Sequence, residues 1–383
     1  MAEFHFLQPI DVLYLRGNRL FGDSSATGEA LMPPWPSMVA GALRSEMLVN
    51  GGVDTGLFVN GIKLSSELEK SLGSIAEPGD FRISHLMLAK VNEGKLESVY
   101  LSLPADLVVI SDGKVKHCHY LQPQALSASI LTSSTCEQLP LFKTEKPAKA
   151  EGGLWLNQIG IKQWLNAQPI TNEHWVESKE LWKIDSRLGI ALDEQGRTTL
   201  EGQLYTVDAV AMQNHIGFLT GVEGANGLIS DGVLRLGGDG RGAHHIKIAW
   251  NPLEPDWNLI EKTKRFRVIL ATPGLFEQGW LLPGMTQENG EYIWKTTDFS
   301  AHLVTASAAR AETISGWDLA ENIPKPALKA VSTGGVYWFD RFEGDIQSLR
   351  KLVESGLSLI AEYPDKKRCA EGFNNIFIAV WPL

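Results

Sequence analysis

The chain contains little cysteine, and its three cysteines, Cys118, Cys136 and Cys369, are far apart in the sequence. Because no C-x-x-C pair occurs, neither a disulfide framework nor a cysteine-based zinc knuckle is expected. The first residues, MAEFHFLQPID, lack a basic segment followed by an apolar run. No apolar stretch approaches the length of a membrane span. These absences predict a soluble protein in a reducing, cytoplasmic setting.

Sequence motifs for nucleotide and metal chemistry are also missing. There is no G-x-x-x-x-G-K-[ST] loop, no G-x-G-x-x-G in a strand–helix setting, no H-E-x-x-H and no G-x-S-x-G. Asp231 and Asp239 are single carboxylates, which are too few for two-metal phosphoryl chemistry. We therefore expect neither a metal nor a cofactor.

The composition is that of a globular protein with a core. Of its 383 residues, 44% are hydrophobic and 21% are charged, and the formal net charge is −10. Acidic residues outnumber basic ones in both halves of the chain. Bulk charge therefore argues against a free-standing nucleic-acid binder, although a local basic groove stays compatible with it because the field depends on clustering.

The length suits two domains, and the proline-containing polar run NPLEPDWN (251–258) is the best boundary between them. We predict an N-terminal domain over residues 1–252, with insertions, and a C-terminal domain over 253–383. Both halves read coarsely as βα…ββαβ. That order describes an α+β fold, with two ferredoxin-like (RRM-like) domains in tandem and inserted loops and hairpins.

Local patterns place the main elements. Strands are predicted at 3–7, 81–88, 96–103 and from 265, and in the aromatic run at 337–339. Hairpins are predicted at Asp112-Gly113 and around the polar segment 194–202. Helices are predicted at 36–52, where Pro36 suits the first turn and two glycines end the helix, at 153–167 and at 345–355. Residues 142–153 read as a loop.

One arrangement occurs twice, over residues 226–250 and 345–381: a helix-length segment, a glycine-containing loop with basic neighbours, and a short apolar strand. Glycine loops let backbone amides approach an anion, most often a phosphate. The first loop, LRLGGDGRG (234–242), offers phosphate contacts at Arg235, Gly237, Gly238, Gly240 and Arg241. A plain tight turn explains the same glycines equally well.

Two other segments carry basic residues. Arg16 and Arg19 lie in the loop after the first strand, and Ser37 and Arg44 lie on the helix that follows. Free amides at the helix start suit a phosphate, while a capping turn with solvated arginines is the alternative.

Lys325 and Lys329 precede hydroxyl residues and the aromatic run, a combination that suits single-stranded nucleic acid. For the aromatic residues themselves, a buried core strand is the favoured interpretation.

Histidines add a catalytic alternative. His244 and His245 adjoin the glycine loop, and His117 and His119 alternate on a predicted strand. A metal-free ribonuclease needs a positioned general acid and base, which a histidine beside a phosphate supplies. With no partnered motif in the sequence, a phosphate contact of His244 or an ordinary surface position is favoured over catalysis.

Six segments, in order across the chain, resemble one protein family. They are PIDVLYLRGNRLF, PPWPSMVAGALRS, SRLGIALDEQGRTTLEGQLYTVDAV, LRLGGDGRG, ATPGLFEQGWLLP and IPKPALKAVSTGGVYWF. The family comprises the third subunits of Cmr (type III-B) CRISPR effector complexes, within the repeat-associated mysterious protein (RAMP) superfamily. The equivalent subunit of type III-A complexes shares the architecture.

The resemblance implies two ferredoxin-like domains and a non-catalytic subunit in antiviral defence. Such a subunit binds the 5′ repeat-derived tag of the CRISPR RNA and docks on the large polymerase-like subunit and on the first backbone RAMP subunit. The glycine loop (Gly237, Gly238, Gly240 and Arg241) matches that of the superfamily, and the helix start brings in Ser37 and Arg44. The second loop departs from the pattern, because Asn374 stands where the superfamily often has glycine.

Two rival functions remain at this stage. One is a metal-independent endoribonuclease of the same superfamily, with His244, His245 or His117 as its base. The other is a protein-bridging scaffold without RNA contact.

Overall fold

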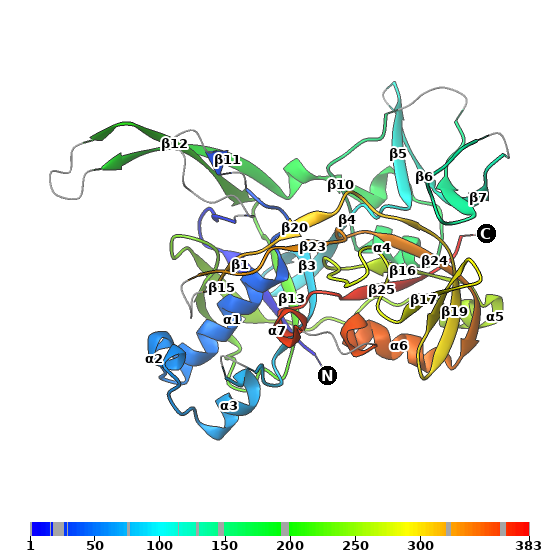
Figure 1. Cartoon of the computed structure of the whole chain (residues 1–383). Coiled ribbons are helices and arrows are strands. Elements are labelled where there is room, and N and C mark those ends of the chain that lie inside the picture. The colour runs from blue at the N-terminus through cyan, green and yellow to red at the C-terminus, as the bar shows by residue number, and fades with distance from the viewer. Residues whose placement is uncertain are drawn as a thin grey trace.

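The computed structural model describes residues 2–382 except 16, 18–26, 29, 75–76, 114, 128–129, 145–148, 193–198, 319–322 and 361–364. Two large sheets form the body of the protein (Figure 1). In spatial order, the first contains β10 (Trp175–Glu177), β9 (Leu154–Leu156), β4 (Lys95–Ser102), β3 (Arg82–Asn92), β13 (Ile216–Glu223), β1 (Glu3–Pro9), β15 (Gly242–Lys247) and β14 (Asp231–Arg235). The second contains β17 (Met285–Glu288), β18 (Glu291–Lys295), β19 (Phe299–Ser307), β24 (Val336–Gly344), β16 (Phe266–Leu270) and β25 (Ile376–Val380).

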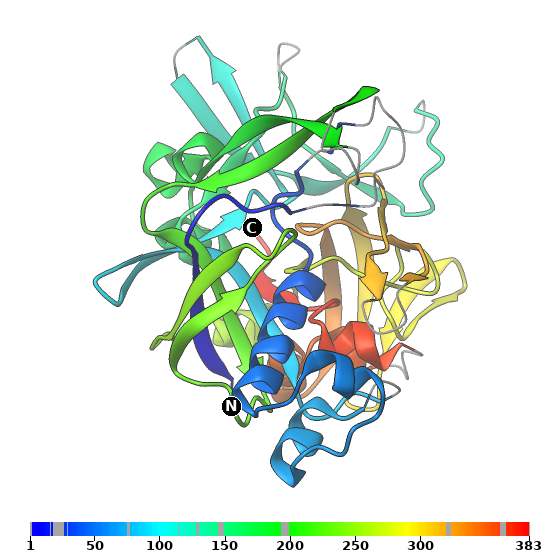
Figure 2. The same ribbon diagram turned by 90° about the vertical axis from the view of Figure 1, so that its left-hand side faces the viewer.

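Helix α1 (Pro36–Asn50) covers one face of the first sheet (Figure 2). Pro36 occupies the first turn, where its missing amide costs nothing, and Gly51 follows the last residue. Val39, Leu43 and Met47, spaced by four, are fully buried against the sheet. The short helices α2 (Thr55–Val59) and α3 (Ser66–Leu72) follow α1.

The opposite face of the first sheet packs on the second sheet and on α4 (Gln158–Leu165). Phe4 and Phe6 of β1 share this core with Trp338 of β24 and Phe377 of β25. Helices α5 (Trp257–Thr263) and α6 (Ile346–Ser355) cover the far face of the second sheet. Both faces of the second sheet are therefore buried, which explains why Tyr337, Trp338 and Phe339 are all inaccessible to solvent.

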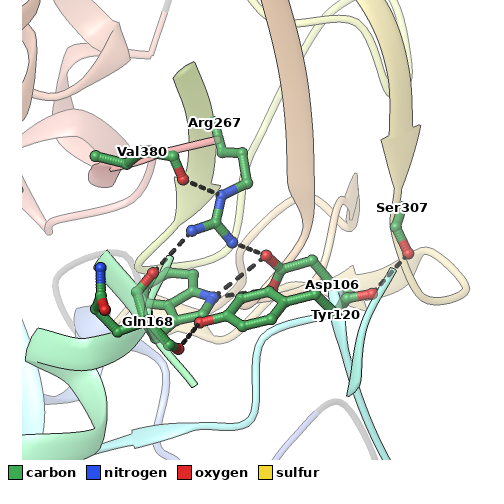
Figure 3. A network of polar contacts seen from close by, with 8 residues as sticks. Asp106, Tyr120, Gln168, Arg267, Ser307 and Val380 are labelled. Carbon is green, nitrogen blue, oxygen red and sulfur yellow. Dashed lines mark hydrogen bonds and ion pairs between the residues drawn. The ribbon is translucent and has the colours of Figure 1, made fainter. Parts of the chain in front are cut away.

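A buried polar network joins the second sheet to α4 and to the connection after β4 (Figure 3). Arg267 of β16 forms an ion pair with Asp106, in the connection after β4, and its Nε donates to the Val380 carbonyl at 2.8 Å. The Trp164 indole of α4 donates to the same carboxylate at 3.0 Å. At the rim of the network, the Tyr120 hydroxyl donates to the Gln168 carbonyl at 2.8 Å.

Smaller ribbons are inserted between these strands. The longest, β11 (Trp182–Leu192) with β12 (Thr199–Met212), extends away from the body (Figure 1). The others pair β5 (Leu107–Asp112) with β6 (Val115–Tyr120), β7 (Gln122–Ala125) with β8 (Gln138–Leu141), β20 (Glu312–Ile314) with β23 (Leu328–Ala330), and β21 (Trp317–Asp318) with β22 (Ile323–Pro324). The two-residue strand β2 (Thr27–Gly28) pairs with β12, and α7 (Lys366–Ala370) precedes β25.

The α+β class and both predicted hairpins are confirmed, but three local predictions are wrong. The segment before the first glycine loop is the edge strand β14, not a helix, because Leu234 must alternate into the core under α1. The helix predicted from residue 153 begins at Gln158, after strand β9. The pattern βα…ββαβ also predicts two helical connections in each half. Residues 224–230 and 271–284 contain no helix, so each half has a helix in only one of these connections.

Candidate nucleic-acid interface

The glycine loop closes the β14–β15 hairpin and packs on the segment that leaves β1. The Gly238 amide donates to the Tyr14 carbonyl at 2.9 Å. Gly237 adopts φ 77°, and a Cβ there would lie 2.9 Å from the same carbonyl oxygen. A larger residue would therefore clash, so this glycine is required by close approach as well as by its backbone conformation.

Arg241, at the other end of the loop, also holds the loop against the segment that leaves β1. Its Nη1 donates to Asp11 Oδ2 at 2.7 Å, and its guanidinium carbon lies 5.0 Å from the centre of the Tyr14 ring. The side chain is about a quarter exposed, 26% by relative area. Arg241 thus has a structural role, and its charge is partly neutralised by Asp11.

Other hydrogen-bond donors of the glycine loop are not used within the described part of the protein. Among the described residues, the amides of Gly237, Asp239 and Gly240 have no hydrogen-bond acceptor, and a Cβ on Gly240 would meet nothing within 4 Å. Arg235, at the end of β14, is exposed and has no ion-pair partner in the described chain. This combination of free amides and one free guanidinium suits a phosphate group.

The start of α1 lies along the same edge of the first sheet as the loop. The Leu31 amide donates to the Leu15 carbonyl at 2.7 Å, which ties the residues before the helix to the segment under the loop. Trp35 then packs with Ile314 and Ala330 of the β20–β23 ribbon. Ser37 is half-buried in the first turn, and Lys329 is exposed on β23. We call this run of elements the glycine-loop edge: residues 235–241, 11–15, 31–37 and 328–330.

The residues before α1 also border a small pocket where the two sheets meet. Tyr100 and Ser102 of β4 line it on one side, and Thr272 and Thr333 line it on the other. The helix start therefore faces the junction between the two halves of the chain.

Two predicted RNA contacts lie elsewhere, around one buried carboxylate. Lys325 pairs with Glu371, and Arg368 donates to the same carboxylate at 3.2 Å. Arg44 donates weakly to the Leu72 carbonyl at 3.4 Å, and burial lowers its pKa while the nearby Glu371 opposes that shift. Arg44 and Lys325 thus both lie near Glu371, and each interacts with groups of the protein itself.

The second glycine loop is interior. A Cβ on Gly372 would lie 2.7 Å from Ile83 Cβ, and Asn374 is fully buried with φ 66°. The Asn374 carboxamide accepts from the Leu275 amide at 2.6 Å, and Asn375 donates to the Ile83 carbonyl at 3.0 Å. This loop joins the two sheets and presents no open surface to a phosphate.

The histidines beside the first loop differ in exposure. His244 Nε2 lies 3.0 Å from Asp231 Oδ1, and the imidazole is partly exposed. His245 is fully buried beside His5, with ring centroids 5.8 Å apart, and burial lowers the pKa of both. Among these three, only His244 is accessible from the surface.

The remaining predicted residues, Arg16 and Arg19, lie outside the described part of the chain. Sequence reasoning missed Asp11, Tyr14 and Trp35, which position the loop and the helix start. Their sequence neighbourhood gives no signal for that role, because each acts through a contact with a residue far along the chain.

Within the described ranges, no group of three or more His, Cys, Asp or Glu side chains is placed to bind a metal ion. Among the helices described, none is both long and apolar enough to cross a membrane.

Residues 5–381 match the model of a family described as CRISPR-associated protein (Cas_Cmr3). A comparison with curated proteins found no match. Among solved structures, a chain of the type III-B Cmr-beta complex bound to cognate target RNA and AMPPnP aligns with 14% identity and a TM-score of 0.49, covering 98% of each chain. A chain of a Csm3–Csm4 subcomplex of a type III-A CRISPR-Cas interference complex aligns with 10% identity and a TM-score of 0.37, covering 90% of this chain and 94% of that one.

Proposed function

Because the chain belongs to the Cas_Cmr3 family of CRISPR-associated proteins, we propose that it is a non-catalytic subunit of a type III-B CRISPR effector complex. The observation that carries the proposal is the family match over residues 5–381, which takes in both sheets and the glycine loop. The family resemblance drawn from the six sequence segments is thereby confirmed. The subtype, type III-B rather than type III-A, is part of the proposal.

In this role the glycine-loop edge binds the 5′ repeat-derived tag of the CRISPR RNA. Free amides at Gly237, Asp239 and Gly240 and the exposed Arg235 support a phosphate contact there. Lys329, on the neighbouring ribbon, adds a second cation. A subunit held in a complex needs only one such edge, so this role is consistent with the net charge of −10.

The same role includes docking to the large polymerase-like subunit and to the first backbone subunit, in the cytoplasm. The β11–β12 ribbon supports a contact with a partner, because Ile184, Leu188 and Ile190 are 48%, 69% and 50% exposed on one of its faces. Aliphatic side chains this exposed are commonly covered in an assembly.

We also propose that each sheet is built on a ferredoxin-like unit. The central strands run β3-β13-β1-β15 in the first sheet and β19-β24-β16-β25 in the second, with antiparallel neighbours throughout. Both orders place the second, third, first and fourth strands of a unit side by side, which is the ferredoxin-like arrangement. Helix α1 fills the first crossover of one unit, and α6 fills the second crossover of the other.

The rival ribonuclease role depends on His244 or His117, since His245 is buried and lacks a hydrogen-bond partner in the described chain. Incubation of the purified protein with a repeat-containing RNA in EDTA tests it. We expect no specific cleavage. Specific cleavage that is lost in His244→Ala or in His117→Ala would establish the enzyme instead.

Binding of the tag is tested by titrating the full-length protein with two RNAs that share a guide but carry the natural or a scrambled tag. The proposed role predicts tighter binding of the RNA with the natural tag. Equal affinity for the two would contradict recognition of the tag, and binding of neither RNA would assign this chain to the scaffold role.

A further inference from the structure

Three aromatic rings form a row on the β5–β6 ribbon and the loop that follows β8. His119 stacks on Phe142, with ring centroids 4.2 Å apart and planes inclined by 24°. His117 lies next to His119, at 6.5 Å between centroids. We call these three residues the ring row. In the view of Figure 1, the β5–β6 ribbon and β15, which directly follows the glycine loop, lie on opposite sides of the molecule.

The ring row faces outward while the other face of β6 is fixed to the protein. His117 is exposed, and His119 and Phe142 are half-buried. Because side chains alternate along a strand, Lys116 and Cys118 point the other way. Lys116 pairs with Glu177 at 2.9 Å, and Cys118 packs on the core shared by the two sheets. The rings are therefore presented on an anchored ribbon.

Two exposed lysines lie near the row in the chain. Lys143 directly follows Phe142, and Lys149 precedes Ala150, which bridges to Ile110 opposite His117. Neither lysine has an ion-pair partner among the described residues. The nearby Glu151 carboxylate accepts from Ser111 at 2.7 Å and lies 4.0 Å from Lys116, so it is already engaged.

We propose that the ring row and Lys143 form a second site for single-stranded RNA, separate from the glycine-loop edge. Flat rings stack on any base, and a lysine beside them contacts a phosphate, which is the combination used for sequence-tolerant single-strand binding. Aromatic rings also occur in protein-docking patches, but lysine is depleted there, so the unpaired Lys143 beside the rings favours RNA. The inference does not rest on the proposed tag-binding role.

The test uses the full-length protein and a fluorescent oligouridine of about 12 nucleotides, within the range of single-strand site sizes. We expect His117→Ala to weaken binding by about fivefold or more, the loss of one stacked base. His117→Tyr keeps a ring face and stays within about twofold of wild type. Lys143→Ala reduces the magnitude of the slope of log K against log salt by about 0.7.

Two substitutions serve as controls. Val115→Ala removes an exposed side chain from the same face of β6, and His215→Asn removes an exposed imidazole elsewhere at a positive φ that asparagine tolerates. Both are expected to bind like wild type.

The site is overturned if wild type does not bind the oligomer, or if His117→Ala binds as wild type does. It is also overturned if His117→Tyr is as weak as His117→Ala, or if photo-crosslinks map only to residues 235–245. Arg235→Ala separates the two sites: weaker binding of the tag RNA in that variant, with oligouridine binding retained, supports the tag site and the ring row independently.

Discussion

Arg267 of β16 and Asp106 of the β4–β5 connection form an ion pair with no exposed side-chain surface on either partner. The guanidinium also donates to the carbonyls of Val380 and Trp164, so its nitrogens find acceptors within the fold. It lies over the rings of Tyr120 and Trp164, at 5.5 and 5.3 Å. One charged pair therefore links the second sheet to α4 and to the insertion of the first half (Figure 3).

Breaking this pair from one side should be costly. Arg267→Met leaves the Asp106 carboxylate buried without its cation, and we expect the free energy of unfolding to fall by about 3–5 kcal/mol. Urea denaturation followed by tryptophan fluorescence measures it. Arg341→Met, which removes an exposed pair with Glu291, should change stability by no more than about 0.5 kcal/mol. A similar small loss for Arg267→Met would contradict the structural role.

Leu43 tests the packing of α1. Its side chain is fully buried between the helix and the first sheet. Leu43→Ala should lower the free energy of unfolding by about 2–5 kcal/mol through lost burial and the cavity that remains. Ser45→Ala, on the exposed face of the same helix, is the matched control. Equal denaturation midpoints for the two variants would show that this face of α1 is not part of the core.

Acid should destabilise the protein through His5. Burial, with a contribution from His245, lowers its pKa to about 4, below the value of about 6.5 in the unfolded chain. The unfolded state therefore binds the proton first. Stability is fully present above pH 6.5 and is lost as the pH falls towards 4, by up to about 3 kcal/mol.

His5→Leu should flatten this dependence between pH 6.5 and 4. Denaturation midpoints at several pH values compare the variant with wild type. Glu3 and Lys247 also act on His5, with opposite signs, and both are retained in the variant. An unchanged pH profile would mean that other groups govern acid unfolding.

Arg235 and Arg241 should behave differently although both flank the glycine loop. Arg235→Ala is expected to weaken binding of the tag and to reduce the salt slope by about 0.7, with no loss of stability. Arg241→Ala should also weaken binding, and it should lower the melting temperature because the contacts with Asp11 and Tyr14 are lost. Identical stability of the two variants would contradict the structural role of Arg241.

The sequence predicts elements whose signals are local. The start of α1 at Pro36, the Asp112-Gly113 hairpin and strand β1 follow from spacing and turn chemistry, and all are observed. The helix predicted before the first glycine loop fails because β14 is required at the sheet edge, a tertiary demand that overrides local pattern.

The candidate site could be predicted only in part, because some of its contacts join residues that are far apart in the chain. Glycines and exposed cations such as Arg235 are visible in the sequence. Whether a cation is free depends on distant partners, and the sequence does not show that Lys325 meets Glu371 or that Arg241 meets Asp11. Positions fixed by such long-range pairs emerge only from the fold.

Photo-crosslinking in the assembled complex tests the central claim most directly. CRISPR RNA carrying 4-thiouridine in its 5′ tag is irradiated with the reconstituted complex, and adducts are mapped by mass spectrometry. We predict adducts on residues 235–241 and 31–37 of this chain. Adducts of the tag that fall only on other subunits, or on this chain only far from the glycine loop, would contradict the account.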